Sequence, residues 1–320
     1  MKILYGIQST GNGHISRSTK IIHRLIKSGC QVDILLSGNN SQIILPFPVK
    51  YHMKGFTLYY DKNSKTDYFK TFYNLNFLQF LKDIKLDLNE YDKIISDFDP
   101  ITAWASKLRE RECIGISNQY SFLSEKTPRP DKKSFIGEFI LNKMAPVSKP
   151  IGIHFEKYDD FIYTPIIKQT MMMLDTSDKG YYLVYLPTYN INDIISNLSN
   201  YTKIKFEVFH PNIDNTKFKN INLNKIHKDK FDESLRHSHG VITAAGFQTT
   251  SESLFLGKKL FCIPIKGQYE QQCNAVSLKK LGVQVGSIDD GLANFLLSSN
   301  PIKLNWKDST DEIINIILSH

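Results

Sequence analysis

Short continuous runs of apolar residues alternate along this chain with longer segments in which apolar positions recur every three or four residues. The runs predict buried strands and the longer segments predict amphipathic helices. The predicted strands cover residues 2–7, 32–36, 93–96, 113–116, 151–154, 181–186, 204–209, 240–243 and 260–263. Because apolar strands alternate with helices, we expect an α/β fold of doubly wound, Rossmann-like parallel sheets.

The length of 320 residues suggests about two domains. The pattern places their boundary near residues 165–177, after which a new strand and helix unit begins. We predict a first domain at residues 1–165, a second at 166–305 and a final helix at 306–320. Ser309 and Glu312 form a capping-box pair before that helix.

The loop after the first strand carries Gly11, Asn12, Gly13 and His14. Glycines at this point let the backbone turn sharply and approach a ligand. A dinucleotide fingerprint needs a third glycine where Ser16 stands, so an oxidoreductase is disfavoured. A neutral imidazole at the start of a helix is a suitable general base near pH 7.

A second glycine turn follows the predicted strand at 240–243, where Gly246 precedes Thr249, Thr250, Ser251 and Glu252. A helix N-terminus there presents unpaired N–H groups and the positive end of the helix dipole, which suits a phosphate. The three hydroxyl groups are expected to add donors. The alternative is an ordinary capped helix of an α/β domain.

A third segment, residues 264–275, follows the next predicted strand. Its amide side chains Gln271, Gln272 and Asn274 pair donors with acceptors, which suits sugar hydroxyls. From Ala244 to Gly282 the chain reads glycine turn, Ser-Glu, Gly-Lys, Pro, Glu-Gln-Gln-x-Asn-Ala and Leu-Gly. This long pattern resembles the donor-binding half of GT-B nucleotide-sugar glycosyltransferases. It is most similar to family 28, the group of the lipid-linked N-acetylglucosaminyltransferase of peptidoglycan synthesis, and its uncharacterised bacterial and archaeal relatives.

The resemblance implies a GT-B fold, in which two Rossmann-like domains face each other across a cleft and the final helix crosses back to the first domain. It implies an inverting transfer of sugar from a UDP-linked donor to a hydroxyl of a glycan or lipid-linked acceptor in the cell envelope. No metal or other cofactor is expected. Two alternatives stay open: a non-catalytic relative that binds a nucleotide sugar, and a GT-B epimerase of UDP-N-acetylglucosamine.

The resemblance also implies roles for individual residues. His14 lies near the acceptor hydroxyl as the base, and Glu252 accepts hydrogen bonds from the ribose. Thr188 lies near the phosphates, and the backbone of Phe231 holds the nucleobase. The other donor-side residues that it implies are Gly246, Phe247, Gln248, Thr249, Thr250, Ser251, Gln268, Glu270, Gln271, Gln272 and Asn274.

Asp97, Phe98 and Asp99 read as D-x-D, the metal signature of the other large glycosyltransferase fold. We expect no metal, because a helix N-terminus supplies positive field to the leaving diphosphate in GT-B enzymes. Asp97 ends a strand and faces the expected cleft. It is interpreted as a partner that orients His14, as the base itself, or as a cap of the next helix. Asn118 and Gln119 follow the next strand and are expected on the acceptor side.

The net charge of +8 admits nucleic acid, an anionic membrane or phosphorylated substrates as partners. Nucleic acid is disfavoured because no basic run or nucleic-acid motif occurs. Residues 59–88 and 126–149 contain many lysines, with aromatic residues in the first and a long loop in the second. They predict either solvated basic faces or a surface for a membrane or lipid acceptor. The sequence shows no signal peptide, no span of about 20 apolar residues and no metal-binding spacing among its four cysteines. We therefore expect a cytoplasmic protein. If residues 59–88 and 126–149 form an exposed surface, we expect it to bind the inner face of the membrane.

Overall fold

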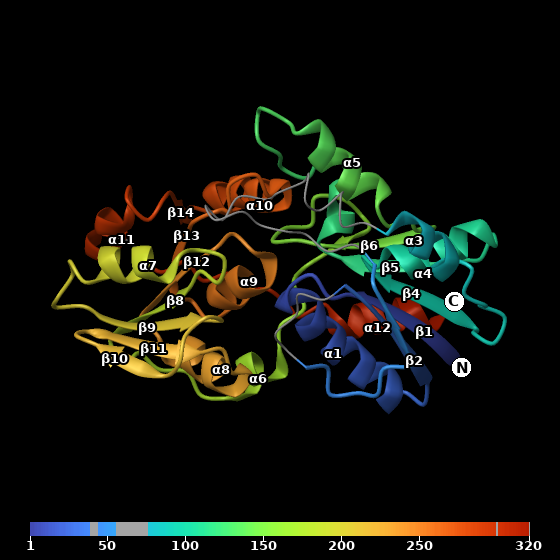
Figure 1. Ribbon diagram of the computed structural model, residues 1–320, viewed down its shortest axis with the longest axis horizontal. Coiled ribbons are helices and arrows are strands. Elements are labelled where there is room, and N and C mark those ends of the chain that lie inside the picture. Colours follow the sequence, from blue (N-terminus) through green and yellow to red (C-terminus); the bar gives the residue numbers. More distant parts are fainter. Residues whose placement is uncertain (39–43, 56–75, 299, 320) are drawn as a thin grey trace.

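The computed structural model describes residues 1–38, 44–55, 76–298 and 300–319. Two seven-stranded sheets lie side by side, each with its own helices (Figure 1). The first runs in the order β3-β2-β1-β4-β5-β6-β7 and the second in the order β10-β11-β9-β8-β12-β13-β14. All neighbouring strands are parallel except β10 and β11. The predicted α/β class with two parallel sheets is confirmed.

The first sheet and its helices come from the N-terminal half of the chain. Its strands are β1 (Lys2–Gln8), β2 (Gln31–Ser37), β3 (Tyr51–Met53), β4 (Lys93–Asp97), β5 (Ile114–Ser117), β6 (Lys149–Ile153) and β7 (Ile162–Tyr163). The helices are α1 (Asn12–Lys27), α3 (Phe77–Asp83), α4 (Pro100–Leu108), the 3-10 helix η1 (Gln119–Leu123) and α5 (Phe135–Lys143).

The second sheet comes from the C-terminal half. Its strands are β8 (Tyr181–Tyr185), β9 (Lys205–His210), β10 (Thr216–Phe218), β11 (Ile221–Lys225), β12 (Gly240–Thr243), β13 (Lys259–Cys262) and β14 (Gln284–Val285). The helices are α6 (Gln169–Met173), α7 (Ile191–Leu198), α8 (Lys228–His237), α9 (Phe247–Phe255), α10 (Tyr269–Lys280), α11 (Leu292–Ser298) and α12 (Thr310–Ser319).

Both faces of each sheet are buried, because successive strand side chains point to opposite faces. In β1, Ile3 and Tyr5 pack in one apolar cluster with residues of α1 and α12, whereas Leu4 packs in another with α4. In β8, Leu183 faces α8 and α9, whereas Val184 faces α7 and α11. This two-sided burial explains the continuous apolar strands of the sequence.

The last helix, α12, lies against α1 of the first domain although it follows the second sheet in the sequence (Figure 1). Arg24 of α1 pairs with Asp311, and Lys93 of β4 donates to the carbonyl oxygen of Ile317. Just before α12, Asp308 accepts from Lys20 of α1 at 2.8 Å. The chain end therefore joins the two halves.

In the stretch 126–149, the predicted loop is followed by helix α5, and hydrogen bonds hold the loop in place. Arg129 is largely buried and donates to the carbonyl oxygens of Phe122, Ser124 and Thr127, and it pairs with Glu138 of α5 at 2.8 Å. These bonds fix the loop, so Arg129 points inward. In the other stretch, residues 59–75 lie outside the described residues.

The four cysteines, Cys30, Cys113, Cys262 and Cys273, are buried free thiols. Among the described helices, none is long and apolar enough to cross a bilayer.

Candidate active site

The glycine turns of the two domains meet at the carboxyl edges of their sheets. A β-carbon on Gly13, at the start of α1, would lie 3.6 Å from the β-carbon of Gln248, at the start of α9. The Asn12 amide donates to the hydroxyl of Tyr185 at the end of β8, at 3.1 Å. Gly11 adopts a φ of 122°, which favours glycine. Two helix N-termini thus converge, as expected for loops that follow parallel strands.

His14 and Asp97 are in direct contact. His14 Nδ1 lies 2.7 Å from Asp97 Oδ1, and the imidazole is largely buried. If Nδ1 carried a lone pair, that lone pair would face the carboxylate oxygen and be repelled by it. Nδ1 therefore carries the proton and donates a hydrogen bond to Asp97. The lone pair of the neutral ring is then on Nε2.

Arg17 and Ser18, one turn further along α1, complete the surroundings of Asp97. The Arg17 guanidinium donates to both carboxylate oxygens, and Ser18 Oγ donates to Oδ2 at 2.7 Å. Burial by itself would raise the pKa of Asp97, but the Arg17 charge and the hydrogen bonds from His14 and Arg17 outweigh it and hold that pKa below its usual range. Asp97 is therefore an ionised, fully bonded carboxylate.

On its Nε2 side, His14 faces Gln119 of η1. Gln119 Nε2 lies 3.4 Å from His14 Nε2 and donates at 2.9 Å to Glu270 Oε2 of α10. Burial raises the pKa of Glu270, an effect that His14 and Gln119 partly offset. Gln119 therefore links the candidate base to the opposite domain. Asn118 Nδ2 donates to the carbonyl oxygen of Ile153 and so links the end of β5 to β6, whereas its Oδ1 is buried with no hydrogen-bond partner among the described residues.

Asp97 and Asp99, the two aspartates of the D-x-D sequence, make different contacts. Asp99 caps α4, accepting from the backbone N–H of Thr102 at 2.7 Å, and it also accepts from Ser37. The capping role belongs to Asp99, whereas Asp97 is in contact with His14. Among the described residues, no group of three or more His, Cys, Asp or Glu is arranged to hold a metal ion.

The start of α9 has open backbone groups. Gly246 is its N-cap, no side chain caps the helix, and a β-carbon on Gly246 would meet nothing within 4 Å. The hydroxyls predicted as phosphate donors differ among themselves. Thr250 and Ser251 donate to carbonyl oxygens of their own helix, Thr250 to Gly246 and Ser251 to Phe247, so they are not available. Thr249 is half-buried and lines a cavity.

Glu252 is fully buried in the middle of α9, outside the first turn, so it is not a cap. It accepts from Gln248 at 2.7 Å and lies 3.2 Å from Lys168 Nζ. Lys168 also pairs with Asp232 of α8 at 2.8 Å. Burial raises the pKa of Glu252, and Lys168 partly counters this.

The amide cluster of α10 has mixed roles. Gln271 Oε1 accepts from the backbone N–H of Ile265, and Asn274 Nδ2 donates to the carbonyl oxygen of Ala245. These two side chains therefore shape the loops before α10 and α9. Gln268, the N-cap of α10, and Gln272 are half-buried.

Two further predicted residues lie in the second domain. The Phe231 backbone N–H donates within α8 to the carbonyl oxygen of His227, so this N–H is not available to a nucleobase. Its ring packs on Tyr185, with 4.9 Å between centroids, and lines the cavity. Thr188 follows β8 and is half-buried.

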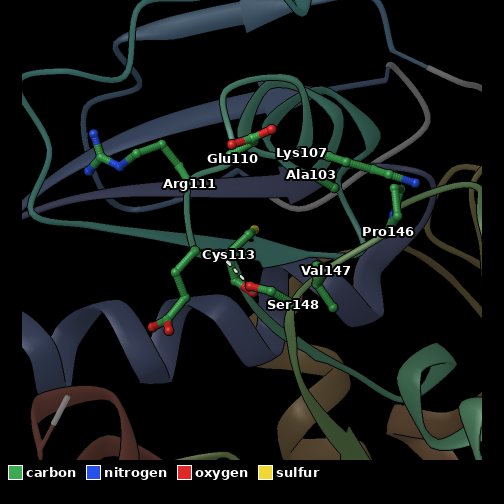
Figure 2. A pocket seen from close by; sticks show the side chains of 9 residues that line it. Ala103, Lys107, Glu110, Arg111, Cys113, Pro146, Val147 and Ser148 are labelled. Atoms are coloured by element: carbon green, nitrogen blue, oxygen red, sulfur yellow. Dashed lines mark hydrogen bonds between the residues drawn. The ribbon is translucent and has the colours of Figure 1, made fainter.

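A cavity of about 50 Å³ lies where the domains meet. Its walls are Asn12, Gly13, Ser16, Lys168, Tyr185, Ile226, Lys228, Phe231, Asp232, Gln248 and Thr249. Figure 2 shows a larger one, of about 530 Å³, between the end of α4 and the segment before β6. Its lining includes Lys107, Glu110, Arg111 and Cys113, at the amino edge of the sheet. That edge is opposite the glycine turns and holds none of the predicted site residues.

The sequence did not point to Arg17, Lys168 or Asp232. Arg17 lies one helical turn after His14 and therefore on the same face of α1, a spacing that was available as a signal. Lys168 and Asp232 carry no local pattern, and only the fold brings them to Glu252.

Solved structures with similar folds include the following three. MurG from Acinetobacter baumannii is 12% identical with a TM-score of 0.57, covering 100% of both chains. UGT89C1 from Arabidopsis thaliana, complexed with UDP, is 13% identical with a TM-score of 0.59, covering 99% of this chain and 94% of that one. A protein assigned as a UDP-N-acetylglucosamine 2-epimerase, from Listeria monocytogenes, is 10% identical with a TM-score of 0.56, covering 100% and 96%. These likenesses show the GT-B fold.

No curated protein sequence matches the chain significantly. The family model described as glycosyl transferase family 1 matches residues 1–298, which include both glycine turns and the His14–Asp97 pair. The chain belongs to glycosyl transferase family 1.

Proposed function

We propose that this glycosyltransferase moves a sugar from a UDP-linked donor to a hydroxyl of a glycan or lipid-linked acceptor, with inversion at the anomeric carbon. The observation that carries the proposal is the position of the His14–Asp97 pair beside two converging helix N-termini. A polarised base and a positive field for a leaving diphosphate are the two groups that such a transfer needs.

On the donor side, the open N-terminus of α9 at Gly246 receives the diphosphate, with Thr249 beside it. Glu252 accepts hydrogen bonds from the ribose. The nucleobase lies against Ile226 and His227, just before α8, which has no side-chain cap. Glu270 and Gln272, at the start of α10, receive the sugar hydroxyls.

In the chemical step, His14 Nε2 takes the proton of the acceptor hydroxyl while its oxygen attacks the anomeric carbon. The bond from that carbon to the diphosphate oxygen breaks, and UDP leaves with the electron pair. Asp97 stabilises the imidazolium that forms, because an ionised carboxylate is already 2.7 Å from Nδ1. The helix N-terminus supplies the stabilisation of the leaving group, so we propose that no metal is needed.

We place the acceptor side on the first domain, where α5 carries exposed apolar residues. Phe135, Ile136 and Phe139 are 86%, 52% and 61% exposed, and the exposed Lys132 and Lys133 precede them. An aromatic and basic surface of this kind suits an anionic membrane that presents a lipid-linked acceptor. The protein then works at the inner face of the membrane, in the cytoplasm.

Thermal denaturation with a panel of nucleoside diphosphates and nucleotide sugars tests the donor assignment. A ligand at 100 times its Kd stabilises the protein by about 2.7 kcal/mol. We expect UDP and at least one UDP-sugar to raise the melting temperature, and no shift with any nucleotide would contradict the proposal.

A non-catalytic sensor and an epimerase are the competing functions. The epimerase has one observation in its favour, namely the fold shared with the Listeria protein. Incubation with a panel of UDP-sugars that includes UDP-N-acetylglucosamine separates the three: an epimerase yields an epimeric UDP-sugar, a transferase yields UDP from one of them, and a sensor yields neither.

A further inference from the structure

Lys168 lines the cavity between the domains. It lies on the connection between β7 and α6, and its side chain is 12% exposed. Its Nζ is 2.8 Å from Asp232 Oδ1 and 3.2 Å from Glu252 Oε2. A buried ammonium between two carboxylates is stable only while those partners surround it.

The backbone that carries Lys168 is fixed on both sides. Gln248 Nε2 donates to the carbonyl oxygen of Ile166 at 3.2 Å, and Thr170 Oγ1 donates to Asp232 Oδ2 at 3.2 Å. The Ile167 N–H donates to Asp308 Oδ1 at 3.0 Å. The segment is therefore anchored to both the second domain and the segment before α12. The four-carbon stem of Lys168 is the flexible part.

The same ammonium stands where a donor must enter. The cavity has about 50 Å³, whereas ligand sites commonly have about 300–1,000 Å³. Glu252 is fully buried and paired, so ribose hydroxyls reach it only after the contact with Lys168 opens. The cavity that Lys168 lines also reaches Gly13 and Thr249, beside the turn to which the diphosphate is assigned.

We propose that Lys168 exchanges partners when the donor binds. Its ammonium leaves Glu252, which takes the ribose hydroxyls, and it binds the diphosphate. This inference rests on the proposed function and adds a donor-binding residue on the interdomain connection. The exchange makes the site selective for a nucleoside diphosphate over the free nucleoside, because only the diphosphate offers the Lys168 ammonium a new partner.

Calorimetric titration of UDP and uridine into wild type, Lys168→Met and Lys168→Arg tests the exchange. In Lys168→Met, UDP affinity should fall about 10- to 100-fold, the worth of a hydrogen bond between charged groups, whereas uridine affinity should not fall. Lys168→Arg should keep most of the UDP affinity. Lys230→Met, which removes an exposed lysine of α8, is the matched control.

An equal loss of affinity for UDP and uridine, or an unchanged UDP affinity, would overturn the role of Lys168. If Lys168→Met unfolds, the double variant Lys168→Met/Asp232→Asn removes one charge of each sign and should show the same selective loss. Wild-type protein that binds neither UDP nor uridine would contradict the proposed function itself. Wild type that binds UDP, with no selective loss in the variants, would contradict only the exchange.

Discussion

His14 Nδ1 lies 2.7 Å from Asp97 Oδ1, although 83 residues separate the two in the chain. The contact joins the first glycine turn to the end of β4, two elements that neighbour each other because β1 pairs with β4. It directs the Nδ1–H of the imidazole toward Asp97 and turns the Nε2 lone pair toward Gln119, whose amide nitrogen lies 3.4 Å away. The proposed mechanism depends on this relationship.

Replacing the base should affect the chemical step alone. We expect His14→Ala to lower kcat by about 10²–10⁴, the usual contribution of a positioned general base. UDP affinity should barely change, because the diphosphate is assigned to α9. Steady-state kinetics together with UDP titration check both parts. Near-normal turnover in His14→Ala would remove the histidine from the mechanism.

Asp97→Asn should lower both turnover and stability, since it leaves the buried Arg17 without its carboxylate. Breaking a buried ion pair costs about 3–5 kcal/mol. Because the folded-state pKa of Asp97 lies below the unfolded value of about 3.9, its contribution is fully present above that pH and is lost as the pH falls through the folded-state pKa.

Urea denaturation of wild type and Asp97→Asn between pH 7 and pH 2 measures this dependence. The difference in unfolding free energy should be largest at neutral pH and should shrink below about pH 4. A difference that stays constant over the whole range would mean that the Asp97 charge does not stabilise the fold.

Glu252 should recognise the ribose. We expect Glu252→Gln to weaken UDP binding by about 1.5–3 kcal/mol, because a charge-assisted hydrogen bond is lost. The affinity for 2′,3′-dideoxy-UDP, which lacks the ribose hydroxyls, should change little. Glu233→Gln, on the exposed side of α8, is the control. Equal weakening of both nucleotides by Glu252→Gln would show that the carboxylate acts only through folding.

The exposed face of α5 should bind anionic vesicles at low salt and release them at high salt. Burying one phenylalanine side chain contributes about 1.5–3 kcal/mol, so Phe135→Ser/Phe139→Ser should lower the vesicle-bound fraction strongly in co-sedimentation. The control variant is Phe218→Ser, on the edge strand β10 of the second domain, and it should not lower the vesicle-bound fraction. Equal recovery of wild type in the supernatant with anionic and neutral vesicles would rule out a membrane surface on α5.

Most of the regular structure could be predicted from the sequence, because both sheets are buried on two faces and their strands read as apolar runs. Five short strands were missed, namely β3, β7, β10, β11 and β14. β10 is exposed throughout, and β11 alternates buried Ile221 and Leu223 with polar residues. Alternation over so few residues carries little signal.

The candidate site could be predicted only where local pattern determines it. The glycine turns and His14 have such a pattern, because a tight strand-to-helix turn selects small residues. No local sequence pattern determines the directions in which the hydroxyl and amide side chains point. Thr250 and Gln271 read as ligand contacts, yet both bond within the protein. Lys168 reaches Glu252 through tertiary packing, which no spacing in the sequence encodes.

The stereochemistry of sugar release tests the central claim most directly. The purified protein should be incubated with a panel of α-linked UDP-sugars, and the products followed by proton NMR from the first minutes, before the sugar mutarotates. Water then stands in for the acceptor hydroxyl. We predict release of UDP together with the β-anomer of one sugar, and loss of both products in His14→Ala. Release of the α-anomer would contradict inversion, and protein that binds UDP but releases none from any UDP-sugar would contradict transfer.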